Sequence, residues 1–394
     1  MRAPRQETTE RRLPYLAQVP FRTFFLIGVL QLLNVVALWL TELGTRAGFW
    51  HAPAPPWPPG ALHAASLLYG VFPFFVFGFT FNAFPKWHGR NPVAPGLFLA
   101  VALLLGTGWL LFYATMLFGA PLEAAFALML GGWLLGCLTL IEIVRRPGIT
   151  PWHTRGVMAV VAMGGVGFAM FGHALAGGDG ALMQASIGIG VWCYAAPLFF
   201  IAAQRVIPMF DGFVVPRLEP YQPVSGLLLA CASLVTHGIL QIGGLMQWRA
   251  APDAVAALVL WLHVARWPLR AIWSQRVLAM LHSGFIWFAI SLTLSALAGF
   301  TGLALGGHAL YLGAFGSLLF AMATRVTQGR VENKERIEAH AWRLFLVLQS
   351  AVILRLAADL LTVEAATLSH LAAAGLFLIA FGAWAALNLH RYLR

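Results

Sequence analysis

The sequence has few charged residues and almost no cysteine. Only 10% of its 394 residues are Asp, Glu, Lys or Arg, whereas a soluble domain carries roughly a quarter. A water-soluble protein of this length needs a polar surface, so the deficit excludes an ordinary soluble fold. The three cysteines, Cys137, Cys193 and Cys231, form no Cys-x-x-Cys pair. This excludes a thiolate metal knuckle and covalent haem attachment through a Cys-x-x-Cys-His motif.

Long hydrophobic runs make up most of the chain. An apolar helix of about 20 residues crosses the ~30 Å hydrocarbon core of a bilayer, and 60% of these residues are hydrophobic. We therefore predict an all-α polytopic membrane protein of about twelve transmembrane helices, with a cytoplasmic tail (residues 1–21) and one membrane domain (22–394). The expected spans are 22–42, 62–84, 95–117, 121–144, 155–176, 182–204, 224–245, 252–266, 277–300, 305–326, 341–362 and 367–390.

The basic residues follow a membrane topology. A formal charge of +11 would suggest a nucleic-acid partner for a soluble protein. Here 22 of the 25 Lys and Arg residues fall on the side of the N-terminus, only Arg46 and Arg249 fall on the other side, and Arg355 lies inside a span. The positive-inside rule then predicts that both termini are cytoplasmic. We expect a lipid bilayer as the partner, and no nucleic acid.

Histidines inside the spans are the candidate site residues, because ionisable groups in a membrane are costly. Five fall in the outer halves of their spans: His63, His173, His237, His308 and His370. His63 and His308 begin the second and tenth spans from the same side, so they share a depth. Facing imidazoles can ligate one haem iron from opposite sides. The alternative for each histidine is a plain hydrogen bond between helices.

Further candidates lie on the cytoplasmic side. His282 lies in the inner part of its span, and with His263 it could serve a second group. Arg90, Arg205 and Arg325 each follow the end of a span. Such arginines bind haem propionates, other anions or carboxylates, or else reach the lipid headgroups. Arg355 and Asp359 are spaced to pair on one helix.

Several sequence blocks, in a fixed order, resemble the NnrS family of membrane proteins. The blocks are residues 21–25 (FRTFF), 62–90 from LH to FPKWHGR, 205–210 (RVIPMF), 281–285 (LHSGF), and 308–326 from HAL to MATRV. Family members are reported to hold haem and copper, and are linked to the nitric oxide response of denitrifying bacteria. The resemblance implies a multi-pass protein of the bacterial inner membrane with haem b, a nitric oxide ligand and an electron donor. The topology is also similar to subunit I of the haem-copper oxidases.

Two departures from the family pattern bear on the chemistry. Where the family has H-x-H-E, this chain keeps His63 but has Ala65 and Ser66, and a G-H-T-G stretch is replaced by residues 329–332 (GRVE). Copper needs two or three convergent N or S donors, so the remaining residues favour haem over copper. Loss of these proton-carrying groups argues against reductase chemistry, and no catalytic residue is assigned. The alternatives are a secondary transporter using intramembrane His and Arg residues, and an assembly or sensory subunit.

Overall fold

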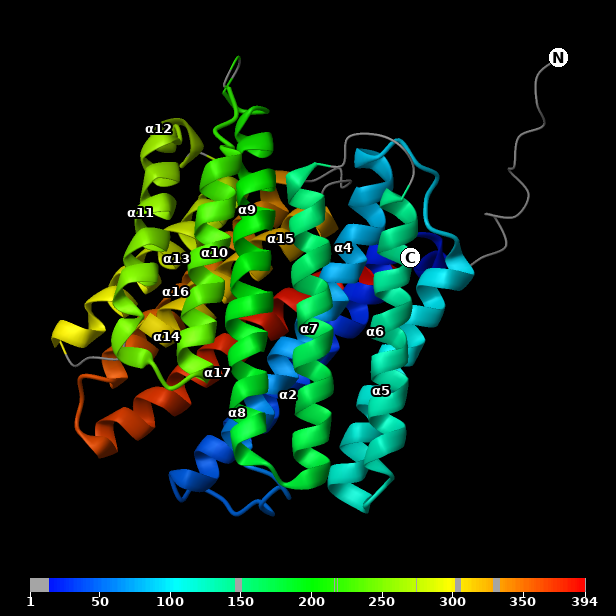
Figure 1. The fold of residues 1–394 in the computed structure, drawn as a ribbon, viewed down its shortest axis with the longest axis vertical. Helices are drawn as coiled ribbons and strands as arrows, with labels where there is room; N and C mark the ends of the chain where they lie inside the picture. Colours follow the sequence, from blue (N-terminus) through cyan, green and yellow to red (C-terminus); the bar gives the residue numbers. More distant parts are fainter. Residues whose placement is uncertain are drawn as a thin grey trace.

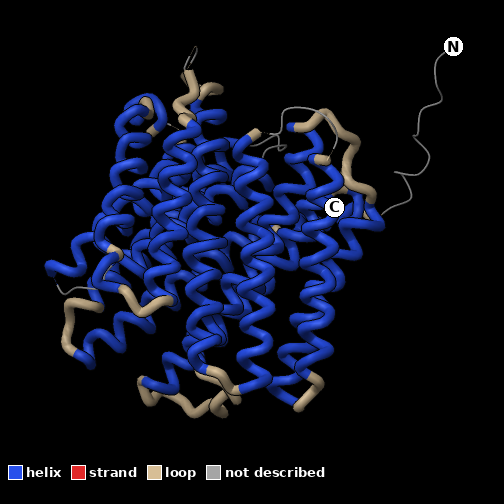
Figure 2. The backbone as a smooth tube through the Cα atoms, viewed as in Figure 1, coloured by secondary structure: helices blue, strands red, loops and turns tan. Residues whose placement is uncertain are grey.

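The computed structural model describes residues 14–145, 151–215, 217, 219–273, 275–301, 306–328 and 334–393. Within these ranges the chain is helical with short connections and no strand (Figure 2). The main helices are α2 (Pro20–Arg46), α3 (Pro59–Ala65), α4 (Phe72–Trp87), α5 (Pro95–Phe118), α6 (Leu122–Val144), α7 (Trp152–Gly177), α8 (Gly180–Ile189), α9 (Ala196–Asp211), α10 (Val224–Ile242), α11 (Ala250–Arg266), α13 (Arg276–Thr301), α14 (Gly306–His308), α15 (Ser317–Gln328), α16 (Lys334–Ala358) and α17 (Val363–Asn388). Shorter turns are η1 (Tyr15–Gln18), η4 (Met246–Trp248), α12 (Leu269–Ile272) and α18 (His390–Leu393).

The predicted all-α membrane fold is confirmed. Among the described residues, eleven helices are long and apolar enough to cross a membrane. The eighth expected span forms α11, whose 17 residues measure about 25 Å at 1.5 Å per residue, a little less than the hydrocarbon core. Helix α11 packs against α10 and α13 in the bundle (Figure 1). With α11 the chain passes through the bundle twelve times, as the sequence predicts.

Three spans change from α- to π-helical hydrogen bonding partway along. The π-helical segments are η2 (Ser66–Val71) between α3 and α4, η3 (Gly190–Ala195) between α8 and α9, and η5 (Ala309–Gly316) between α14 and α15. Their first residues are about 120 residues apart. The second, sixth and tenth spans are therefore equivalent in this respect. Such segments are rare in helices and occur often at functional sites.

Proline and glycine fix where several elements begin and end. Pro73 and Pro197 follow η2 and η3 by two residues. Because proline has no amide N–H, the helical ladder loses one hydrogen bond there, and the wider π turn precedes both prolines. Gly119 and Gly178 end α5 and α7 with positive φ angles, a conformation that glycine adopts without strain.

The two ends of the bundle differ in the residues they carry. We call the end where α3 and α14 begin the histidine end, because His63 and His308 lie there. We call the opposite end, where α4, α9 and α15 finish, the arginine end. Arg90, Arg205 and Arg325 lie there, and the ends of α4 and α9 are at the top of Figure 1. Helix α2 packs against both α4 and the C-terminal helix α17. The first and twelfth spans are thus neighbours.

Candidate functional site

A cavity of about 450 Å³ lies toward the histidine end of the bundle. Its walls come from α2, from the second, sixth and tenth spans, and from α16 and α17. His63 and His308 both line it. We call it the histidine cavity. Its volume is within the ~300–1,000 Å³ typical of ligand sites. The structure brings the two histidines to one space, as their shared depth predicts, and their role as iron ligands stays a prediction.

The ring of His63 is held by aromatic packing. Its imidazole stacks on the indole of Trp39, with ring centroids 4.5 Å apart and planes 19° apart. The Nδ1 atom of His63 is buried and has no hydrogen-bond partner among the described residues. Buried polar atoms usually have a partner. A fixed imidazole with an unpartnered nitrogen, at the wall of a cavity of this size, fits a neutral donor to a bound group.

Two arginines and a third histidine gather at the same cavity. Arg46, Arg355 and His370 line it. The Nη1 atom of Arg355 lies 2.7 Å from Asp359, which is the pairing that their i, i+4 spacing predicts. Arg46 Nε lies 2.7 Å from a carboxylate oxygen of Glu42. The Nε2 atom of His370 is buried without a partner in the described part of the chain. Guanidinium groups in such positions suit a carboxylate-bearing ligand.

The other predicted histidines lie elsewhere. The Nε2 atom of His282 is 3.0 Å from Asp211. His237 donates from Nδ1 to Asp253 over 2.6 Å. The side chain of His173 is exposed. None of these three histidines lines the histidine cavity. His237 and His282 form buried polar contacts between helices through these carboxylates, and a cofactor-binding role for the three histidines stays a prediction.

His263 is also engaged within the protein. Its Nδ1 atom is 2.7 Å from the carbonyl oxygen of Val259, and its Nε2 atom is 3.0 Å from Gln204. The same Gln204 amide contacts His153 through its oxygen at 3.0 Å. Both ring nitrogens of His263 therefore have partners, and a pairing of His263 with His282 around a second group gains no support.

The three predicted arginines lie at the arginine end, away from the histidine cavity. Arg90 donates to the carbonyl oxygen of Ile143 at 3.2 Å, and Arg205 to Gln222 at 3.3 Å. The guanidinium of Arg325 lies 4.8 Å from the centre of the Phe210 ring. A role for these three arginines at a bound anion therefore stays a prediction, separate from the histidine cavity. The arginines that line the histidine cavity are Arg46 and Arg355.

The loop after α4 carries one histidine with a shifted pKa. Burial lowers the pKa of His88 below its usual value of 6.5, and the positive charge of Arg90 lowers it further. The Nε2 atom of His88 is 3.3 Å from the hydroxyl of Thr154. His88 is therefore neutral at pH 7 and links the second and fifth spans at the arginine end.

Sequence reasoning missed several polar residues. Arg46 falls in an expected outer loop. Basic residues are rare on that side, where Arg46 and Arg249 are the only two, and this rarity was a signal. Asp211 and Asp253 were not singled out, and both are almost fully buried. Each belongs to a small set of 14 acidic residues. The replaced G-H-T-G stretch, residues 329–332, lies outside the described residues.

The fold and the cavity define a class: a polytopic α-helical membrane protein with paired histidines lining an internal cavity. The family model described as NnrS protein matches residues 15–394, nearly the whole chain, and the chain belongs to the NnrS family. A comparison with curated proteins found no match. The family resemblance seen in five separate blocks is thereby confirmed.

Proposed function

We propose that this protein binds haem b in the histidine cavity and serves the nitric oxide response of a bacterial inner membrane. The observation that carries the proposal is that His63 and His308, on separate spans, line one cavity of about 450 Å³. Neutral imidazoles are the usual protein ligands of haem b iron. The unpartnered Nδ1 atom of His63 supports a ligand role for that side chain.

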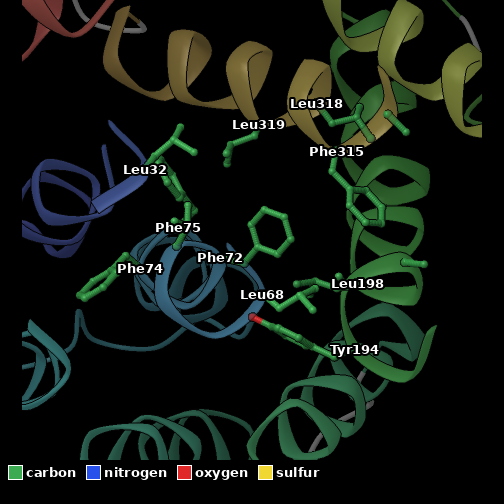
Figure 3. Packing of buried hydrophobic residues seen from close by; sticks show 14 of the residues in the cluster. Leu32, Leu68, Phe72, Phe74, Phe75, Tyr194, Leu198, Phe315, Leu318 and Leu319 are labelled. Carbon is green, nitrogen blue, oxygen red and sulfur yellow. The ribbon is translucent and has the colours of Figure 1, made fainter. Parts of the chain in front are cut away.

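The rest of the wall suits the periphery of such a group. Arg46 and Arg355 would hold its carboxylates, and the half-buried His370 would add a further donor. Leu32, Leu68 and Phe315 would supply apolar surface for the porphyrin ring (Figure 3). When bound, haem b would bind a diatomic ligand at an open position, or pass electrons if both axial positions are filled. The residues of this chain fix its orientation and keep water from its face.

The charge distribution supports a location and an orientation. With 22 basic residues on one side and two on the other, the positive-inside rule supports a cytoplasmic position for both termini. The histidine cavity then opens toward the periplasmic half of the bilayer, and the arginine end faces the cytoplasm. A fusion of alkaline phosphatase at the C-terminus should be inactive, and a fusion of green fluorescent protein there should be fluorescent.

The visible spectrum of the purified protein tests the haem proposal. Protein produced with an added haem precursor should show a reduced b-type spectrum. His63→Ala and His308→Ala should each lose most of it. His173→Ala is the matched control, because this histidine also lies in a span but its side chain is exposed. Folded wild-type protein without colour, or variants that keep full haem content, would overturn the proposal.

A second candidate function is transport of a small anion. Two observations favour it: Arg46, Arg355 and His370 share one cavity, and three spans are interrupted by π-helical segments. Interrupted helices surround the substrate site in many transporters. Liposomes containing the protein should then take up a small carboxylate, and Arg355→Gln should abolish uptake. Haem that fills the cavity with one equivalent per chain would exclude this function.

A further inference from the structure

A second, smaller cavity lies between the histidine cavity and the arginine end. Its volume is about 100 Å³. Phe75 and Phe79 of α4, Val157 of α7, Leu198 of α9 and Leu318 of α15 line it. Thr80, Trp87, His153 and Arg205 also border it, but only carbon atoms of its lining residues face the interior. We call it the apolar cavity. It lies where the second, sixth and tenth spans meet, the three spans that contain π-helical segments.

The two cavities are neighbours that share two side chains. Phe72 and Leu319 line both of them. The Phe72 ring lies edge-on to Phe199 at 5.2 Å and to Phe315 at 5.9 Å between centroids. Figure 3 shows the Phe72 ring projecting into the space between Leu319, Phe315 and Leu198. Side chains, and not a helix backbone, therefore separate the cavities.

The chemistry of the walls limits what the apolar cavity can take. A void lined by carbon stays dry and accepts xenon or small hydrocarbons. A polar or charged solute would lose its hydration without gaining a hydrogen bond, at a cost of several kcal/mol. A small uncharged gas has little hydration to lose. The volume is too small for a ring system as large as a porphyrin, which needs a cavity of the ~300–1,000 Å³ class.

We propose that the apolar cavity is a docking site for a small uncharged gas molecule, which reaches the histidine cavity by displacing the Phe72 ring. The destination of the gas rests on the proposed function, whereas the binding site itself does not require haem. Rotation of a phenyl side chain is a local motion, so passage needs no separation of the helices. The π-helical segment η2 ends at Val71 and places Phe72 at the boundary.

Xenon is the probe for the site, because it resembles a diatomic gas in size and polarity and scatters strongly. A structure of the protein under xenon pressure should show xenon between Val157, Leu198 and Leu318. Val157→Phe, which fills the cavity, should abolish that peak. Ala202 also lines the cavity, and Ala202→Leu is a milder filling variant if Val157→Phe does not fold. The control is Leu110→Phe on the lipid-facing surface of α5, where Leu110 is 69% exposed.

The possible results separate this inference from the haem proposal. Xenon in the apolar cavity of wild type and Leu110→Phe, and its loss in the filling variants, supports the docking site even in protein without haem. Ordered water, a lipid tail or no density in the cavity of wild-type protein would overturn it. In haem-loaded protein, Phe72→Trp should slow carbon monoxide recombination after photolysis. An unchanged rate would overturn the route past Phe72.

Discussion

The imidazole of His63 and the indole of Trp39 are stacked with their planes only 19° apart. Trp39 belongs to α2 and His63 to α3, so the stack ties the first span to the start of the second. Arg46 also lies over the Trp39 ring, 5.3 Å from its centroid. One indole thus positions both a candidate iron ligand and a candidate carboxylate-binding cation.

Removing this stack should loosen the haem. Trp39→Leu is expected to lower haem content and to broaden the reduced spectrum, because the imidazole ring can then rotate. Trp39→Phe keeps an aromatic face and should retain most of the haem. Trp248→Leu provides the comparison, since Trp248 is 65% exposed and lies in a connecting segment. Equal haem in Trp39→Leu and in the wild type would contradict a positioning role.

The Arg355–Asp359 pair should tune the reduction potential in opposite directions. Arg355→Gln removes a positive charge at the cavity, which stabilises the ferric form and lowers the potential. Asp359→Asn removes a negative charge and should raise it. We expect shifts on the order of 50 mV, since a tenfold change in a one-electron equilibrium corresponds to 59 mV. Redox titration of each variant measures the shift, and two shifts of the same sign would refute the electrostatic account.

The contact between His237 and Asp253 should matter for stability and not for haem. Asp253 also accepts a hydrogen bond from Ser295 at 2.6 Å, and it is 1% exposed. Asp253→Ala leaves a buried histidine without its partner, which costs about 3 kcal/mol. Thermal unfolding in detergent should show a lowered midpoint with haem content unchanged. Glu364→Ala, at an exposed position, should leave the midpoint unchanged, and a similar drop there would refute the assignment.

A tight contact at Gly167 predicts a large effect from one methyl group. A Cβ atom there would lie 2.4 Å from the hydroxyl of Tyr69, and that hydroxyl donates to the carbonyl oxygen of Ser186 at 2.6 Å. Gly167→Ala should therefore destabilise the protein by about 1–3 kcal/mol through overpacking. Gly131→Ala meets no atom within 4 Å and should be neutral or stabilising by about 0.5–1 kcal/mol. Thermal unfolding of both variants tests the contrast.

The spans and the candidate histidine pair were predictable because they depend on local patterns. Hydropathy located the spans, and the side from which each helix begins gave His63 and His308 the same depth. The positions of Arg46 and Arg355 at the histidine cavity were not predictable in this way. One lies at the end of α2 and the other in the eleventh span, and only tertiary packing brings them to the same cavity.

The acidic partners were missed for the same reason. His237 and Asp253 are on neighbouring helices, but His282 and Asp211 are 71 residues apart. The depth of a histidine cannot reveal whether a carboxylate from another helix reaches it. The π-helical segments η2 and η3 had a visible signal in Pro73 and Pro197. Segment η5 has no such proline, so its hydrogen bonding follows from packing alone.

Segment η2 also sets the rotational phase of the second span. His63 and Phe72 are nine residues apart, and at about 100° per residue an unbroken α-helix would turn them to opposite faces. Both nevertheless border the histidine cavity, because a π turn acts like an inserted residue and shifts the phase of everything after it. The span can thus present its first half and its second half to the same space. The number of residues in the second span is therefore as critical as the hydrophobicity of that span. Deletion of a single residue within η2 would rotate His63 away from the cavity, although the span would stay equally apolar.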